Sequence, residues 1–111
     1  MESSIHIREY PANDESSKTL ILFHDIGGGH YSFNHLIPLL VAQNVNVVVF
    51  DYIGHGHSSG TRGHFDSIEV IKEFLSELHT HSKLAQGSDV YTLALNQGAL
   101  ISLYYSTLYD N

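Results

Sequence analysis

Short apolar runs divide the chain at regular intervals. Thr19–His24, Val45–Asp51 and Asp89–Leu95 are almost wholly apolar, and each ends close to glycine or polar residues. Runs of this length and composition are typical of strands that are buried on both faces of a parallel sheet. Ser4–Tyr10 instead alternates apolar and polar residues and is followed by Pro11, which predicts a strand at a sheet edge.

Apolar residues three and four positions apart predict a helix after each of the three apolar runs. The first helix begins near Tyr31 and contains Pro38, the second begins at Asp66 or Ser67, and the third begins at Gly98. Strands that alternate with helices form parallel sheets with right-handed crossovers and helices on both faces. The sequence therefore predicts an α/β fold with three layers and a mostly parallel sheet.

The length and the charge of the chain narrow the classes of protein to which it can belong. Its 111 residues fit one domain, residues 1–111. Only 15% of them are charged, against about 25% in an average domain, so we expect other protein chains to cover part of the surface. The net charge is −7 and lysine and arginine form no run, which argues against nucleic acid as a partner.

The sequence contains no motif that predicts a cofactor or a metal site. There is no cysteine, and the glycines form neither a Walker A loop nor a complete dinucleotide-binding loop. Two histidine pairs, His55 with His57 and His79 with His81, carry groups that can ligate a metal. Residues two apart on a helix point away from each other, so we interpret the second pair as solvated side chains and predict no metal site.

Segments that direct a protein to a membrane are also missing. The longest apolar stretch, residues 36–42, is far shorter than the ~18 residues that cross a bilayer. The first ten residues hold two glutamates and lack the apolar core of a secretory signal, and no Asn-x-Ser/Thr site occurs. We therefore expect no membrane span and an intracellular location.

Three motifs follow the predicted parallel strands, at the sheet edge where ligands bind in open α/β folds. They read HDIG at 24–27, DYIGHGHS at 51–58 and ALNQGA at 94–99. In this order and spacing they resemble the α/β-hydrolase superfamily, most closely its monoacylglycerol lipase and serine aminopeptidase branch, from Thr19 to Asn111. The resemblance implies a truncated α/β-hydrolase fold, the amino-terminal half only. The family's loop positions are here His24, Asp25, Gly27, Asp51, Gly54, His55, Gly56, Ser58 and Gly98.

The third motif occupies the place of the family's nucleophile elbow, in which a serine sits on a strained turn between a strand and a helix. In this sequence the serine position is Asn96. An amide nitrogen is not a useful nucleophile, because its lone pair is delocalised into the carbonyl group. Asparagine does tolerate positive φ, so we expect the turn to persist without its reactive group.

Other parts of the family's catalytic site are altered as well. The family's order is serine, then an acid, then histidine, but after Asn96 the chain has only Asp110 and no histidine. The resemblance assigns the oxyanion hole to the backbone N–H groups of Ile26 and Gln97. Asp25 stands where the family has glycine, and a carboxylate there disfavours a developing negative charge.

These departures favour a catalytically inactive hydrolase relative that serves as a structural or binding subunit of a larger assembly. In the family's strand order, Asp89–Leu95 lacks a neighbour on one side, and the face under the first helix is only partly shielded. We therefore expect other protein chains to cover this edge and face. Two alternatives stay open. The chain is half of a monoacylglycerol lipase-like or esterase-like serine hydrolase that acts on acyl esters and is completed by another polypeptide, or it binds a small molecule non-covalently over the elbow.

Overall fold

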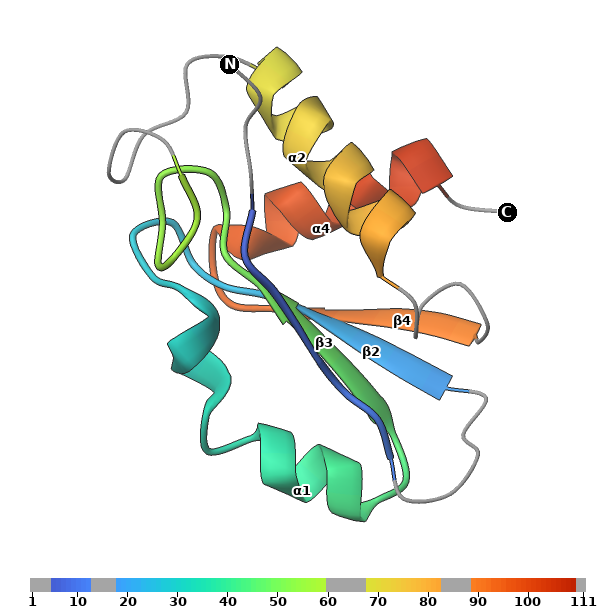
Figure 1. The fold of residues 1–111 in the computed structure, drawn as a ribbon. Helices are drawn as coiled ribbons and strands as arrows, with labels where there is room; N and C mark the ends of the chain where they lie inside the picture. Colours follow the sequence, from blue (N-terminus) through green and yellow to red (C-terminus); the bar gives the residue numbers. More distant parts are fainter. Residues whose placement is uncertain (1–4, 13–17, 60–67, 83–88, 110–111) are drawn as a thin grey trace.

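A four-stranded sheet lies between helices on its two faces in the computed structural model of the chain, which describes residues 5–12, 18–59, 68–82 and 89–109 (Figure 1). The helices α2 and α4 cover one face and α1 lies under the other. The three predicted layers are therefore confirmed. The elements along the chain are β1 (Ile7–Tyr10), β2 (Lys18–Phe23), the 3-10 helix η1 (His30–Phe33), α1 (Ile37–Ala42), β3 (Asn46–Phe50), α2 (Ile68–His81), β4 (Asp89–Ala94) and α4 (Gly98–Tyr109).

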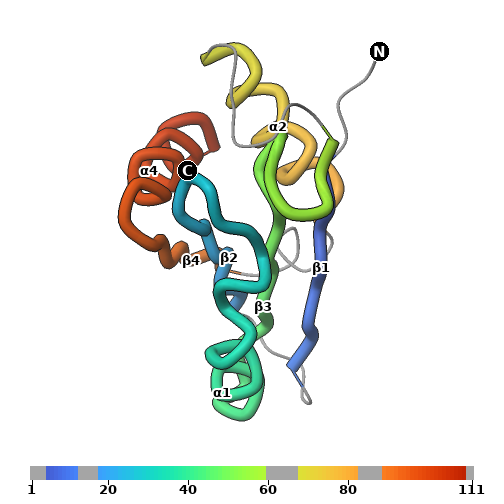
Figure 2. Tube along the Cα trace, turned by 90° about the vertical axis from the view of Figure 1, so that its left-hand side faces the viewer, coloured from blue at the N-terminus to red at the C-terminus, as the bar shows by residue number. Residues whose placement is uncertain are grey.

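The order of the strands across the sheet is β1-β3-β2-β4. The strands β2, β3 and β4 run parallel to one another, whereas β1 pairs antiparallel with β3. Figure 2 shows β1 at one edge of the sheet and β4, followed by α4, at the other. The predicted edge strand and the mostly parallel sheet are both confirmed. Because β2, β3 and β4 are parallel, the turns that carry the three motifs meet at one end of the sheet.

Two clusters of buried side chains hold the layers together. On one face, the rings of Phe23 and Phe50 pack edge to face, with 5.3 Å between their centroids. Phe74 of α2 and Tyr105 of α4 close this cluster from above the sheet. On the opposite face, the following residues form the second cluster: Leu22, Phe33, Ile37, Val47 and Val49.

The first predicted helix is divided in the structure. A continuous helix from Tyr31 was the expectation, but the chain forms η1, then a turn, and then α1 from Ile37. Pro38 falls in the first turn of α1, where its missing N–H group needs no partner and its fixed φ suits a helix. The proline therefore sets the start of α1 instead of interrupting a longer helix. The predicted start of the second helix, Asp66 or Ser67, lies outside the described residues.

The last strand is the main departure from the sequence pattern. Asp89–Leu95 was predicted to be buried on both faces, but every residue of β4 except the half-buried Ala94 is exposed. Tyr91 and Leu93 expose 52% and 40% of their surface. The reason is that β4 forms the edge of the described sheet, so no strand lies beyond it among the described residues.

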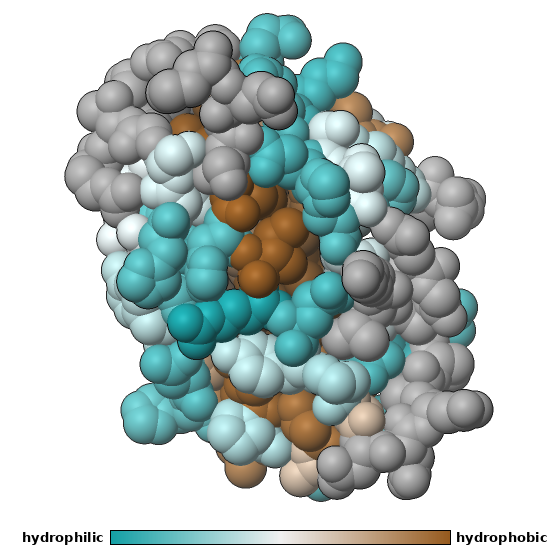
Figure 3. Space-filling model, viewed as in Figure 1, coloured by the Kyte–Doolittle hydropathy of each residue, from teal (hydrophilic) through white to brown (hydrophobic). Residues whose placement is uncertain are grey.

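The surface carries further apolar residues. Figure 3 shows hydrophobic surface in the middle of the viewed face and near its lower end, with hydrophilic residues between the two areas. Leu39 on α1, for example, is 64% exposed. No helix within the described ranges is long and apolar enough to cross a bilayer.

Candidate functional site

The turn after β4 has the backbone geometry of a nucleophile elbow. Asn96 has a φ of 51°, so the positive φ predicted for this position is confirmed. The helix that follows approaches β2 so closely that a Cβ at Gly98 would collide with the backbone oxygen of His24 and lie 2.8 Å from that of Phe23. The turn is therefore built on one residue that tolerates positive φ and one that has no side chain.

The carboxylate of Asp25 occupies the position beside this elbow. Its Oδ1 accepts hydrogen bonds from the backbone N–H groups of Ile26, at 2.9 Å, and Gln97, at 3.1 Å. Its Oδ2 accepts a third from the side-chain amide of Asn96, at 3.2 Å. The two N–H groups that the family resemblance assigns to the oxyanion hole thus both donate to a carboxylate of the chain itself. The sequence predicted that Asp25 would oppose an oxyanion, but not that it would accept hydrogen bonds from these donors.

His24 is a buried structural residue. Its Nδ1 donates to the backbone oxygen of Asp25 at 2.6 Å, and its Nε2 accepts the backbone N–H of Tyr52 at 3.1 Å. The hydroxyl of Tyr52 donates to the backbone oxygen of His24 at 2.6 Å, and the two rings lie 3.7 Å apart. Burial lowers the pKa of His24 to about 4 and raises the pKa of Tyr52, so both side chains are neutral near pH 7.

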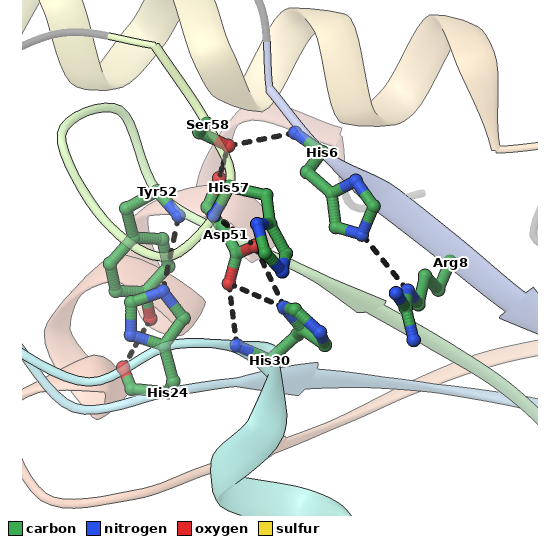
Figure 4. A network of polar contacts seen from close by, with 8 residues as sticks. All are labelled: His6, Arg8, His24, His30, Asp51, Tyr52, His57 and Ser58. Atoms are coloured by element: carbon green, nitrogen blue, oxygen red, sulfur yellow. Dashed lines mark hydrogen bonds and ion pairs between the residues drawn. The ribbon is translucent and has the colours of Figure 1, made fainter.

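Asp51 organises the loop after β3 (Figure 4). Its carboxylate accepts the backbone N–H groups of His30 and His57, and His30 Nδ1 lies 2.8 Å from its Oδ2. Burial alone would raise the pKa of Asp51, but the hydrogen bonds from His57 and His30 lower it overall. The buried side chain is therefore a carboxylate near pH 7. A Cβ at Gly56 would overlap with this carboxylate, and φ there is 49°, so the loop can close on Asp51 only with glycine.

Glycines at positive φ and the hydroxyl of Ser58 shape the loops that follow β2 and β3. Gly27 and Gly54 have φ values of 89° and 77°, a region that glycine adopts without strain. Ser58 joins the loop to the segment before β1, because its hydroxyl donates to the backbone oxygen of Asp51 at 2.6 Å and accepts the backbone N–H of His6 at 2.7 Å.

The first histidine pair is separated in space. His55 Nδ1 donates to the backbone oxygen of Ile53 at 2.9 Å, and its ring lies 5.2 Å from that of His24. His57 instead approaches the rings of His6 and His30, although no pattern in the sequence connects the three residues. Burial lowers the pKa of His6, although Asp51 opposes this shift. The abundance of histidine was the only signal for this cluster, since its members are far apart along the chain.

The second histidine pair is exposed as predicted, but its members differ. The ring of His79 stacks on that of Tyr109 with 3.9 Å between centroids and 11° between planes. Nδ1 of His79 also lies 3.2 Å from the hydroxyl of Tyr105. His79 therefore fastens α2 to α4 and is more than a solvated side chain.

Comparisons with known proteins agree with this geometry. Residues 14–111 match the family model of the serine aminopeptidases, S33. An uncharacterized abhydrolase domain-containing protein of Dictyostelium discoideum is 29% identical over 68 residues, which are 61% of this chain and 7% of that protein.

Solved structures resemble the chain over nearly its whole length. A carboxylesterase of Nitrososphaera gargenis has a TM-score of 0.75 and 23% identity, and 96% of this chain covers 38% of it. A monoacylglycerol lipase of Paleococcus ferrophilus has a TM-score of 0.68 and 26% identity, and the match covers 97% of this chain and 38% of the lipase. A probable hydrolytic enzyme of Pseudomonas aeruginosa has a TM-score of 0.79 and 16% identity, and the match covers 96% of this chain and 33% of that enzyme. The chain thus spans little more than a third of these structures. It belongs to the S33 serine aminopeptidase family of the α/β-hydrolase superfamily.

Proposed function

We propose that this chain is a catalytically inactive member of its family and that it acts as a structural or binding subunit of a larger protein assembly. The observation that carries the proposal is the position of Asp25. Its carboxylate accepts the hydrogen bonds of Ile26 and Gln97 that an acyl-transfer enzyme keeps for its oxyanion.

Two requirements of acyl transfer are not met at this elbow. The first is a nucleophile, but the amide of Asn96 donates to Asp25 and offers no reactive lone pair. The second is stabilisation of the negative charge that develops on the substrate oxygen. A substrate oxygen entering here would meet a carboxylate instead of two N–H donors. Both effects act in the same direction, against catalysis.

The exposed edge of the sheet supports a role in assembly. By register, Tyr91 and Leu93 of β4 flank Leu20 and Leu22 of β2, on the sheet face where α1 packs. Tyr91 and Leu93 are exposed there, whereas Leu22 is fully buried. We infer that another polypeptide adds a strand to β4 and covers these side chains. The solved structures that resemble this chain are about two and a half to three times as long, which supports a strand-bearing segment as the occupant.

A fluorophosphonate probe tests the loss of catalysis. We expect no covalent labelling of the full chain, because no activated serine stands at the elbow. Asn96→Ser should also remain unlabelled, since Asp25 still accepts the two N–H groups of the oxyanion hole. Labelling of the wild-type chain would overturn the proposal, and mass spectrometry of the labelled peptide would identify the nucleophile.

Sedimentation velocity tests the role of the edge. We expect the full chain, purified alone, to self-associate through β4, because this edge offers both apolar side chains and backbone hydrogen-bonding groups. Leu93→Lys should reduce the association, since a charge on this face opposes burial. Leu39→Lys is the matched control, because Leu39 is exposed on α1 and away from β4. A monodisperse wild-type monomer would contradict the assembly role.

A further inference from the structure

Side chains of four residues converge beside the loop that follows β3, and none of them belongs to the elbow. The rings of His6, His30 and His57 have pairwise centroid distances of 5.0 Å, 5.1 Å and 5.2 Å. His6, His30 and Asp51 each offer one ligand atom, and these atoms lie within 4.8 Å of one another. The residues come from three separate segments and lie close together in Figure 4. We propose that His6, His30 and Asp51 bind a divalent transition-metal ion, with His57 as a further ligand on the exposed side.

The types of donor select the class of ion. Imidazole nitrogens with one carboxylate suit Zn²⁺, Co²⁺ and Ni²⁺, whereas Mg²⁺ and Ca²⁺ require a set of oxygen ligands. Zinc bonds of about 2.0–2.2 Å place neighbouring ligand atoms about 3.4 Å apart in a tetrahedron. Nδ1 of His30 and Oδ2 of Asp51 are 2.8 Å apart, so this hydrogen-bonded pair has to open by about half an ångström for an ion to bind both atoms. The ligand atoms of the three residues lie within 4.8 Å of one another, so the more distant ones have to approach by up to about 1.4 Å.

Hydrogen bonds already hold the ligand-bearing segments together. The backbone N–H groups of His30 and His57 orient the carboxylate of Asp51. The hydroxyl of Ser58 binds the backbone of Asp51 on one side and the backbone of His6 on the other. Outer contacts of this kind fix the directions of metal ligands. The ion would therefore bind to a largely formed site.

Arg8 is the group that opposes the ion. Its Nε donates to Nε2 of His6 at 2.9 Å, which brings a positive charge to the site and engages one of the candidate donors. Arg8 is exposed, so its side chain can turn into solvent when an ion enters. Removal of this guanidinium should therefore strengthen metal binding, an effect that a merely structural histidine cluster does not predict.

Calorimetric titration of the full chain with zinc chloride tests the proposal. We expect one ion per chain, and tetrahedral visible absorption when Co²⁺ replaces Zn²⁺. His6→Ala should weaken binding by more than about 100-fold, because loss of an outer contact alone costs about 10- to 100-fold. Arg8→Ala should tighten it several-fold. His81→Ala is the matched control, since His81 is exposed and distant in sequence from the cluster, and it should bind as the wild type does.

Three results would overturn the site. They are no zinc binding by the wild-type chain, unchanged affinity in His6→Ala, and loss of affinity in His81→Ala, which would indicate an adventitious surface histidine. Asp51→Asn provides a second ligand variant, but Asp51 is buried, so its circular dichroism and thermal unfolding must first match those of the wild type. His6 is only half-buried and Arg8 is exposed, so these two variants carry the test if Asp51→Asn does not fold.

Discussion

The neighbouring strands β2 and β4 are both rich in apolar residues but have different surroundings. Leu22 and Leu93 are partners in register on the same face of the sheet, yet Leu22 is fully buried and Leu93 is 40% exposed. The turns after these strands differ in the same way. His24 after β2 is sealed against Tyr52, whereas Asn96 after β4 is exposed. The chain therefore stabilises β2 by its own packing, while β4 retains apolar side chains that its own fold does not cover.

The largest expected effect concerns the pair of leucines. Leu22→Ala should lower the free energy of unfolding by about 2–5 kcal/mol, because it leaves a cavity in a closed cluster. Leu93→Ala should lower it by less than about 1 kcal/mol, because much of that side chain already contacts water. Urea denaturation of both variants measures the difference. Equal losses would mean that β4 is as well packed as β2, and would remove the basis of the comparison.

The next effect is the pH dependence that His24 gives to stability. Its pKa is about 4 in the folded chain and 6.5 when exposed, so the unfolded chain binds the proton first. Neutral His24 therefore contributes its full stabilisation of the folded chain above pH 6.5. This stabilisation is lost as the pH falls toward 4, by about 3 kcal/mol in all. Urea denaturation at several pH values in this window should show the loss. His24→Gln should remove most of this pH dependence, whereas His81→Gln should leave it unchanged. The lowered pKa of His6 adds a loss of stability in the same direction.

The close approach of the elbow to β2 predicts a smaller effect. Gly98→Ala should destabilise the chain by about 1–3 kcal/mol, because the new methyl group meets the backbone of His24 and Phe23. Ala99→Ser, at the exposed neighbouring position, should change stability by less than about 0.5 kcal/mol. Thermal unfolding distinguishes the two variants. A neutral Gly98→Ala would show that β4 and α4 shift freely relative to β2.

The smallest expected effect tests the conformation of Asn96. Asn96→Ala should cost about 1 kcal/mol, because alanine is strained at a φ of 51°. Asn96→Gly should be close to neutral, since glycine adopts this region freely even though the hydrogen bond to Asp25 is lost. Thermal unfolding of the two variants measures this difference. If both variants lose the same stability, the hydrogen bond and not the backbone is what holds the turn.

Local patterns in the sequence predicted much of the fold. Three apolar runs identified β2, β3 and β4, and the motif around Asn96 identified the elbow and its positive φ. The exposure of β4 was not predictable from its residues, because an apolar run has the same composition whether or not a neighbour covers it. The sequence pattern places Pro38 inside a longer helix, although the residue stands in the first turn of α1.

The candidate sites depended on contacts between distant segments. Asp25 and Gln97 are 72 positions apart, and only the folded chain shows that the carboxylate accepts the N–H group. His6, His30 and His57 likewise belong to separate segments, so no spacing rule connects them. His55 and His57, by contrast, are only two positions apart, but they contact different parts of the molecule.

The pairing of β2 with β4 also has a consequence for biosynthesis. Lys18 pairs with Asp89, 71 positions later in the chain. At about 5–20 residues per second, a ribosome needs about 4–14 s to make that interval. Once β3 has been made it can pair with one side of β2, but the other side has no partner until β4 follows. The nascent chain therefore presents an open apolar strand for seconds, and ribosome-associated chaperones should bind it until β4 has emerged.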